Sequence, residues 1–387
     1  MIQLRGITWQ HTRGYLPMVA TAQRFEETHT GVSINWELRS LQAFADYPIE
    51  RLAKEFDLLV IDHPFSGRAA LGDVLLPLDD FLPDPFLADL AANSVGRSWE
   101  SYRYKNHLWA LPTDAATPIS AYRPDLMQKH KVAVPQTWSE LLDLAKRGLV
   151  ALPAIPIDSL MHFYMLCGAL GIELFVRRDI VVSEEIGVPS LQRLRELISL
   201  CDSVCLQRNP IATWEAMSSG DDIAYCPFAY GYSNYSRPGY ARHTLQAGGL
   251  LRLDTGEPLR STLGGAGIAI SLITKHREIA LEYAEFVASP LCQMGIYFHS
   301  GGQPGHRKAW LDGGVNSLSN DFFRATLPTL DSAYVRPRFD GYLHFQENAA
   351  LAVHRYLIHG DNELQVLNEL NRLLCAARRR IQEEEEA

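Results

Sequence analysis

Two short loops carry side chains that can hold a polar ligand. Trp9, His11 and Arg13 follow the first predicted strand, and Asp62 and His63 follow the third. An imidazole such as that of His11 can donate a hydrogen bond to a hydroxyl or a carboxylate. The Arg13 guanidinium can bind an anionic group through two hydrogen bonds. Arg13 can equally well begin a solvated helix, and the Asp62–His63 pair can be purely structural. We expect all five residues to line a ligand site.

A second group of candidate ligand contacts is aromatic. Phe228, Tyr230 and Tyr232 share one face if their segment is a strand, with Ala229 and Gly231 between them. Such a face accepts a planar or ring-shaped ligand by stacking, and the phenol hydroxyls add hydrogen-bond partners. The alternative is an aromatic face packed on a helix. The polar, glycine-rich sequence that follows favours stacking.

A glycine-rich segment, Gly264-Gly265-Ala266-Gly267, superficially resembles a dinucleotide-binding loop. The third glycine of that fingerprint is replaced here by an apolar run typical of a strand, so no nucleotide cofactor is predicted. We expect Gly264 and Gly265 to form part of a ligand-site wall, where the absence of a side chain lets a ligand approach closely.

Alternating strands and helices position the first group of candidates. Apolar patterning predicts an α/β fold in β-α-β-α-β order, with strands at 4–9, 32–38 and 56–61 and helices near 15–27 and 48–55. In an open parallel sheet, ligands bind beyond the carboxyl ends of the strands. The loops after residues 9 and 61 are therefore predicted to lie at the site.

The segment 101–144 contains several elements in immediate succession. Its residues predict a two-stranded ribbon around Lys105-Asn106, a strand at 119–122, a short helix at 126–131 and a further helix capped by Thr137. Glu140 completes a capping box with Thr137, and one apolar face is expected from Trp138, Leu141, Leu142 and Ala145.

In this order, the segment resembles the substrate-binding proteins of ATP-binding-cassette (ABC) importers, the maltose-binding-protein-like group. The resemblance extends to LLPLDDFL at 75–82, EAMSSG at 215–220, LGGAGIAIS at 263–271 and ALEYAEFVASP at 280–290, and so covers nearly the whole chain. It implies a two-lobed, type II periplasmic-binding-protein-like fold with a ligand cleft between the lobes. A fold resemblance does not name the ligand.

The resemblance also implies a domain organisation. The expected N-terminal lobe comprises 1–112 and 264–308, the C-terminal lobe 113–263 and 309–377, and residues 378–387 form a charged tail. It places Asp114 at a crossover between the lobes, where the carboxylate accepts ligand hydroxyls or merely caps a turn. A length of 387 residues independently favours two domains.

Charge and known catalytic motifs narrow the classes of function. The net charge of −9 and the lack of a basic stripe argue against nucleic-acid binding. No G-x-S-x-G, H-E-x-x-H or phosphate-loop motif occurs, and the acidic pairs Asp79-Asp80 and Asp221-Asp222 fall where turns are expected. We therefore predict a monomeric binding protein that is not an enzyme and has no cofactor.

The six cysteines bear on metal binding and on cellular location. Cys167, Cys201, Cys205, Cys226, Cys292 and Cys375 have no paired metal-ligand spacing, so we predict buried thiols and no metal site. Cys201 and Cys205 lie one turn apart if 191–206 is helical.

The start of the sequence and the cysteines bear on cellular location. The sequence leads from Met1 directly into a predicted strand, which indicates either a trimmed periplasmic form or a cytoplasmic protein. Cysteines that are not paired in disulfides favour a reducing compartment.

The predicted function is the binding of a small polar solute, a sugar or oligosaccharide, for delivery to an ABC permease. The resemblance and the stacking aromatics favour carbohydrate. The alternative is a cytoplasmic sensor or sequestering protein of the same fold that binds an anionic or aromatic acid, which His11, Arg13 and His63 would suit.

Overall fold

The computed structural model describes residues 1–169 and 171–385, which fold into two compact units. Unit 1 comprises 1–116, 263–317 and 338–340, and unit 2 comprises 117–262, 318–337 and 341–387. The predicted lobes divide the chain slightly differently, because 113–116, 263, 309–317 and 338–340 belong to unit 1. The predicted charged tail begins within the helix Glu363–Glu385, and residues 386–387 lie outside the described part.

Unit 1 is built on a five-stranded sheet in the order β2-β1-β3-β10-β6. Its strands are β1 (Ile2–Trp9), β2 (Val32–Arg39), β3 (Leu58–Ile61), β6 (Leu111–Ala116) and β10 (Gly264–Ile270). Strand β1 runs parallel to β2 and β3, whereas β10 is antiparallel to β3 and β6. The predicted strands at 4–9, 32–38 and 56–61 are confirmed, each to within two residues at either end.

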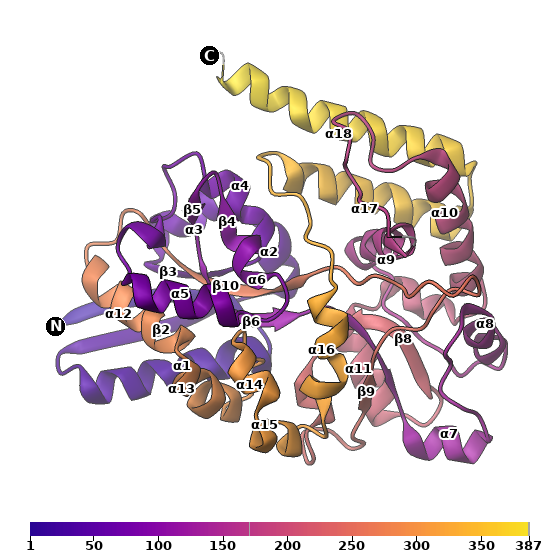
Figure 1. Ribbon diagram of the computed structural model, residues 1–387, viewed down its shortest axis with the longest axis horizontal. Coiled ribbons are helices and arrows are strands. Elements are labelled where there is room, and N and C mark those ends of the chain that lie inside the picture. The colour runs from indigo at the N-terminus through magenta and orange to yellow at the C-terminus, as the bar shows by residue number, and fades with distance from the viewer. Residues whose placement is uncertain (170, 386–387) are drawn as a thin grey trace. The chain divides into compact units, whose positions relative to one another are not determined.

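Helices α1 and α12 pack against this sheet and against each other (Figure 1). Tyr283 of α12 joins the layers, because its hydroxyl lies 2.9 Å from the Thr21 hydroxyl of α1 and accepts a hydrogen bond from the Trp36 indole of β2 at 3.2 Å. The helices of unit 1 are α1 (Thr12–Thr28), α2 (Leu41–Asp46), α3 (Ile49–Glu55), α4 (Ser66–Ala69), α5 (Asp84–Asn93), α6 (Ser98–Tyr102), α12 (Arg277–Ala288), α13 (Pro290–Cys292), α14 (Arg307–Leu311) and α15 (Gly313–Leu318).

The segment 338–340 belongs to unit 1 because of one arginine. The Arg338 guanidinium donates to the backbone carbonyls of Glu100 and Arg103, the latter at 2.6 Å. The Arg338 carbonyl in turn lies directly against Gly67 of α4, where a Cβ atom would come within 1.7 Å of the oxygen. No local pattern in the sequence predicts this docking.

Unit 2 combines a small sheet with a group of helices. The sheet has the order β8-β7-β9, with β7 (Pro118–Tyr122) antiparallel to β8 (Tyr225–Tyr230) and β9 (Gln246–Gly248). Helices α17 and α18 run side by side, and α17 also packs on α9 (Figure 1). The helices of unit 2 are α7 (Pro124–His130), α8 (Trp138–Lys146), α9 (Pro156–Gly168), α10 (Glu184–Ser199), α11 (Pro210–Ser219), α16 (Phe322–Asp331), α17 (Tyr342–His359) and α18 (Glu363–Glu385).

The local signals in 101–144 are largely confirmed. Lys105 and Asn106 have positive φ angles of 48° and 71° and form the turn between β4 (Arg103–Tyr104) and β5 (His107–Leu108). Thr137 and Glu140 make both hydrogen bonds of the capping box at the start of α8. The predicted apolar face is wrong in one position, since Leu144 rather than Leu142 is buried there.

The cysteines follow the prediction in part. Among the described residues, Cys167, Cys205, Cys226 and Cys292 are buried, and none of the six cysteines forms a disulfide. The condition for Cys201 and Cys205 to lie one helical turn apart is not met, because α10 ends at Ser199 and Cys205 lies in a separate 3-10 turn, η3 (Ser203–Gln207). Within the described chain, no helix combines the length and the apolar character needed to cross a bilayer.

Asp158 on α9 is a carboxyl group buried in unit 2, and its Oδ2 has no hydrogen-bond partner. Burial raises the pKa of Asp158 well above its usual value, because the charged form is desolvated. In the unfolded chain Asp158 has an ordinary pKa, so above about pH 4 the unfolded state binds fewer protons than the folded state. The contribution of Asp158 to stability therefore falls as pH rises from about 4.

We expect Asp158→Asn to remove this pH-dependent loss of stability, because the amide mimics the protonated carboxyl and cannot ionise. The wild type should lose up to about 1.4 kcal/mol per pH unit relative to the variant as pH rises above about 4. Urea unfolding of both proteins from pH 4 to 8 measures the difference. The exposed Asp143→Asn is a suitable control, since the Asp143 side chain is 75% exposed. Parallel pH profiles for wild type and Asp158→Asn would contradict the prediction.

Candidate functional site

The first candidate group lies at the junction of β1 and α1 in unit 1. Trp9 ends β1, His11 is the N-cap of α1, and Arg13 is in its first turn. The His11 Nδ1 accepts the Arg13 backbone N–H at 3.0 Å, which caps the helix. The Trp9 ring lies over Gly14, where any Cβ atom would come within 2.4 Å of the indole. Helix capping therefore orients the His11 side chain, and the close ring contact orients that of Trp9.

Arg13 is paired with Asp114 of β6. The Arg13 Nε donates to Asp114 Oδ2 at 2.8 Å, and Nη2 donates to Oδ1, so both carboxylate oxygens are engaged. The two side chains are only 4% and 1% exposed. Of the two alternatives for Arg13 in the sequence analysis, the solvated helix start is therefore wrong. The structure brings Arg13 and Asp114 together although 101 residues separate them in the sequence.

Apart from the Arg13–Asp114 ion pair, the titratable side chain of this group, His11, is uncharged near pH 7. Burial, with a smaller contribution from the Arg13 charge, lowers the pKa of His11 to about 3, so the imidazole is neutral near pH 7. Because its Nδ1 accepts a hydrogen bond, the proton resides on Nε2. Burial raises the pKa of Asp114, and the positive charge of Arg13 opposes that rise.

Asp62 and His63 follow β3 at the same edge of the sheet. The Asp62 carboxylate accepts the His63 backbone N–H at 2.8 Å and caps the 3-10 turn η1 (His63–Phe65). The same carboxylate oxygen lies 3.1 Å from the His63 Nδ1, and the His63 ring meets Tyr102 edge-on at 6.4 Å between centroids. The structural pairing considered as an alternative is therefore present, and it also fixes the direction of the imidazole.

Gly264 and Gly265 begin β10, opposite Ala116 and Ala115 of β6. Gly265 has a φ of 109°, and a Cβ atom there would come within 2.4 Å of the Asp114 carbonyl oxygen. Glycine at 265 is thus required by contact with the neighbouring strand. This physical reason differs from the close ligand approach that the sequence predicts.

The aromatic group lies in unit 2 and does not form one continuous face. Phe228 is inside β8 and meets His162 of α9 edge-on, with ring centroids 4.5 Å apart, so for this residue the helix-packing alternative is the one observed. Tyr230 ends β8, and its hydroxyl lies 3.2 Å from the Thr262 hydroxyl. Tyr232 lies beyond the strand, where it precedes the 3-10 turn η4 (Ser233–Ser236).

Sequence reasoning missed polar residues that support both groups. Near Asp114, the Gln303 side chain donates to the Ala115 carbonyl at 2.8 Å. In unit 2, the Tyr235 hydroxyl donates to the Glu215 carboxylate at 2.7 Å, and Tyr240 meets the Tyr235 ring edge-on at 5.2 Å. The tyrosines are visible as an aromatic-rich segment, but no sequence signal connects them to Glu215.

The arrangement contains groups that suit the binding of a polar ligand. In unit 1 it offers an indole, a neutral imidazole and a carboxylate whose charge is matched by an arginine. Such groups can exchange hydrogen bonds with hydroxyls and cover an apolar ring face. The carboxylates of this group, Asp62 and Asp114, each contact a neighbouring basic side chain.

Comparisons with known proteins agree with this architecture. Residues 8–169 match the family model described as bacterial extracellular solute-binding protein. Maltose-bound MalE3 of T. maritima is similar to the chain with a TM-score of 0.82 at 16% identity, covering 97% of this chain and 99% of the other. A ribitol-bound ABC transporter solute-binding protein of Agrobacterium radiobacter K84 gives a TM-score of 0.81 at 20% identity, covering 96% and 97%.

A third structure, an ABC transporter solute-binding protein of Thermotoga lettingae TMO bound with α-D-tagatose, has a TM-score of 0.81 at 19% identity, with 97% of this chain and 100% of that chain covered. At these identities the structural likeness shows the fold. Residues 8–169 are thus similar to the bacterial extracellular solute-binding proteins, and over nearly its whole length the chain has the two-lobed, type II fold of these solved structures.

Proposed function

We propose that this protein binds a neutral sugar or polyol and delivers it to an ABC importer, without catalysis. The family model supports solute binding, and solved structures of the same fold are described as bound to maltose, ribitol and D-mannitol. Delivery to a permease follows from the class of those proteins. That the ligand lies between the two units stays a prediction.

The observation that carries the choice of a neutral ligand is the Arg13–Asp114 pair. The pair places a positive and a negative charge in bidentate contact, so the carboxylate already compensates the guanidinium expected to bind an anion. His11 is neutral near pH 7 because its pKa is lowered to about 3. A ligand carboxylate would therefore meet no uncompensated charge from these three residues, whereas a hydroxyl can donate to Asp114 and accept from His11.

We propose Trp9, His11 and Asp114 as ligand contacts of unit 1 and Tyr230 and Tyr232 as those of unit 2. The indole supplies a flat apolar surface for a sugar ring, and the tyrosines combine such a surface with a hydroxyl. Asp62, His63, Gly264 and Gly265 support the shape of the site in unit 1. Phe228 supports Tyr230 from within the same strand.

A thermal-melting panel of neutral sugars, polyols, organic acids, aromatic acids and sugar phosphates tests the proposal. A ligand present at about a hundred times its dissociation constant adds roughly 2.7 kcal/mol to the stability and raises Tm. We expect Tm shifts with sugars or polyols only, and recovery of the ligand unchanged after prolonged incubation. Shifts confined to acids would contradict the proposal and support the alternative of an acid-binding sensor.

The variant His11→Asn locates the site within unit 1. Asparagine retains an N-cap acceptor for α1 but lacks the imidazole, so stability should change little while affinity for the identified ligand falls about tenfold, as expected for the loss of one well-placed hydrogen bond. His299→Asn is the matched control because His299 is exposed. Equal affinities for the two variants would remove His11 from the site and leave the ligand class unchanged.

A further inference from the structure

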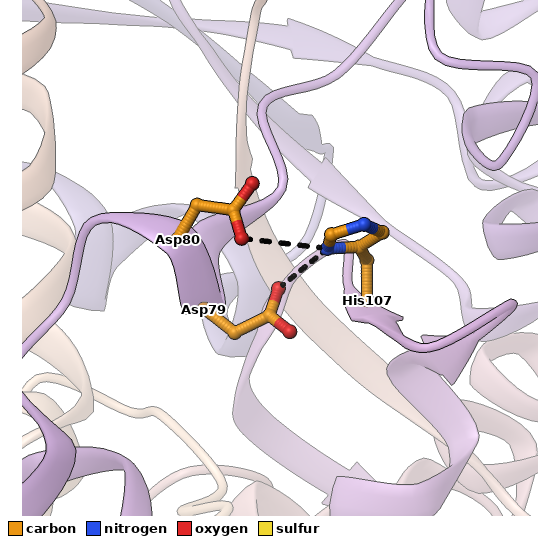
Figure 2. A group of neighbouring side chains, drawn as sticks. All are labelled: Asp79, Asp80 and His107. Atoms are coloured by element: carbon orange, nitrogen blue, oxygen red, sulfur yellow. Dashed lines mark ion pairs between the residues drawn. The ribbon is translucent and has the colours of Figure 1, made fainter.

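Three side chains of types that can bind a metal ion lie close together in unit 1, outside the candidate ligand site. We call Asp79, Asp80 and His107 the His107 cluster; Figure 2 shows both carboxylates directed at the same edge of the imidazole. Asp79 and Asp80 end the 3-10 turn η2 (Leu78–Asp80), and His107 begins β5. One ligand atom from each side chain lies within 4.8 Å of the other two.

The distances in the cluster suit a shared cation better than direct hydrogen bonds. The His107 Nδ1 lies 3.4 Å from Asp79 Oδ1 and 3.7 Å from Asp80 Oδ1. Hydrogen bonds from nitrogen to oxygen measure about 2.7–3.2 Å. Ligand atoms about 2.0–2.1 Å from a tetrahedral zinc ion are separated by roughly 3.3–3.4 Å, which is close to the observed spacing.

The orientation of His107 is a second, independent observation. The side chain is 40% exposed, yet its Nδ1 is inaccessible to solvent and has no hydrogen-bond partner. The ring thus turns its exposed edge outward and its Nδ1 toward the two carboxylates. Trp109 holds the ring edge-on at 5.7 Å between centroids, and the Trp109 indole is itself anchored to the Tyr104 carbonyl at 2.9 Å.

The Asp79 carboxylate is held in place by a backbone hydrogen bond, and among the described residues no lysine or arginine forms an ion pair with Asp79 or Asp80. The Leu108 backbone N–H donates to Asp79 Oδ1 at 2.8 Å, an orienting contact of the kind that commonly supports metal ligands. Among the described residues, His107 is the only basic side chain within ion-pair distance of Asp79 or Asp80. Two carboxylates beside one imidazole therefore leave local negative charge that a divalent cation would neutralise.

We propose that the His107 cluster binds a divalent transition-metal ion of the zinc type. One imidazole nitrogen and two carboxylate oxygens form a donor set that zinc accepts, with water completing the coordination from the exposed side. The ion would join η2 to the β4–β5 ribbon, two segments of unit 1. The sequence predicts no metal site because the ligands are split between residues 79–80 and 107, with no recognised spacing.

Calorimetric titration of the metal-stripped full-length protein with Zn²⁺ tests this inference. The variants His107→Gln and Asp80→Asn remove one ligand each at partly exposed positions. We expect each to weaken Zn²⁺ binding at least about tenfold, with little change in Tm in the absence of metal. His299→Gln and Asp84→Asn are matched controls at exposed positions of the same unit, and they should bind Zn²⁺ as the wild type does.

Free thiols also bind zinc, and Cys201 and Cys375 are partly exposed. Co²⁺ separates the two possibilities, because thiolate ligation gives an intense near-ultraviolet charge-transfer band that nitrogen and oxygen ligands do not give. The inference requires Co²⁺ binding without that band, lost in His107→Gln. It is overturned if Zn²⁺ does not bind, if all variants bind equally, or if the thiolate band accounts for the bound metal.

Discussion

Replacing Asp114 by alanine is expected to lower the free energy of unfolding by about 3–5 kcal/mol, because it leaves the Arg13 guanidinium buried without its carboxylate. Both side chains are almost fully buried, and two hydrogen bonds join them. Urea unfolding measures the change in midpoint.

An exposed ion pair in the same unit provides the control. Glu37 and Arg5 are each 50% exposed, so Glu37→Ala should cost less than about 1 kcal/mol. The double variant Arg13→Met with Asp114→Leu should lose much less than the sum of the two single losses, since it leaves no unpaired charge. If Asp114→Ala costs no more than Glu37→Ala, the pair contributes nothing specific to unit 1.

Gly67→Ala should produce the second large effect, a loss of about 2–3 kcal/mol from overpacking. Its Cβ would lie 1.7 Å from the Arg338 carbonyl oxygen and 2.8 Å from the Phe339 carbonyl carbon, so a backbone segment must move. Such a shift would pull Arg338 from the carbonyl that it reaches at 2.6 Å. Thermal melting and limited proteolysis near residues 338–340 measure the loss of stability and the release of the segment.

Gly313→Ala is the matched control for this substitution. A Cβ atom at 313 would have no neighbour within 4 Å, and the residue begins α15, where alanine is favourable. We expect no loss of stability and no new cleavage near 338–340. Equal behaviour of the two variants would mean that the contact between Gly67 and Arg338 is not required for the fold.

Local chemistry made much of the fold predictable. The alternation of apolar segments predicts β1, β2 and β3, and the Thr137–Glu140 capping box predicts the start of α8, because each signal depends on neighbours only a few residues away. The end of α10 at Ser199 is not marked by glycine or proline nearby, so the sequence alone does not show whether the helix reaches Cys205.

The candidate site is less predictable because its contacts are long-range. The sequence identifies Arg13 and Asp114 as polar residues near strand ends, but not that they bind each other across 101 residues. Composition likewise cannot show that Phe228 packs on His162, or that the Asp114 carbonyl, rather than a ligand, requires the glycine at 265. The type of a residue predicts which hydrogen bonds and ion pairs its side chain can make. Which other residue it contacts depends on the tertiary structure.

The place of β10 in the sheet of unit 1 has a consequence for biosynthesis. Strand β10 lies between β3 and β6, yet it follows β6 in the chain only after the long stretch 117–262 of unit 2. A ribosome adding about 5–20 residues per second needs roughly 7–30 s to make that stretch. During that interval β3 and β6 lack the strand that pairs with both of them in the folded sheet. Unpaired strand edges can pair with other chains, so we expect the nascent chain to be most prone to aggregation before Gly264 emerges.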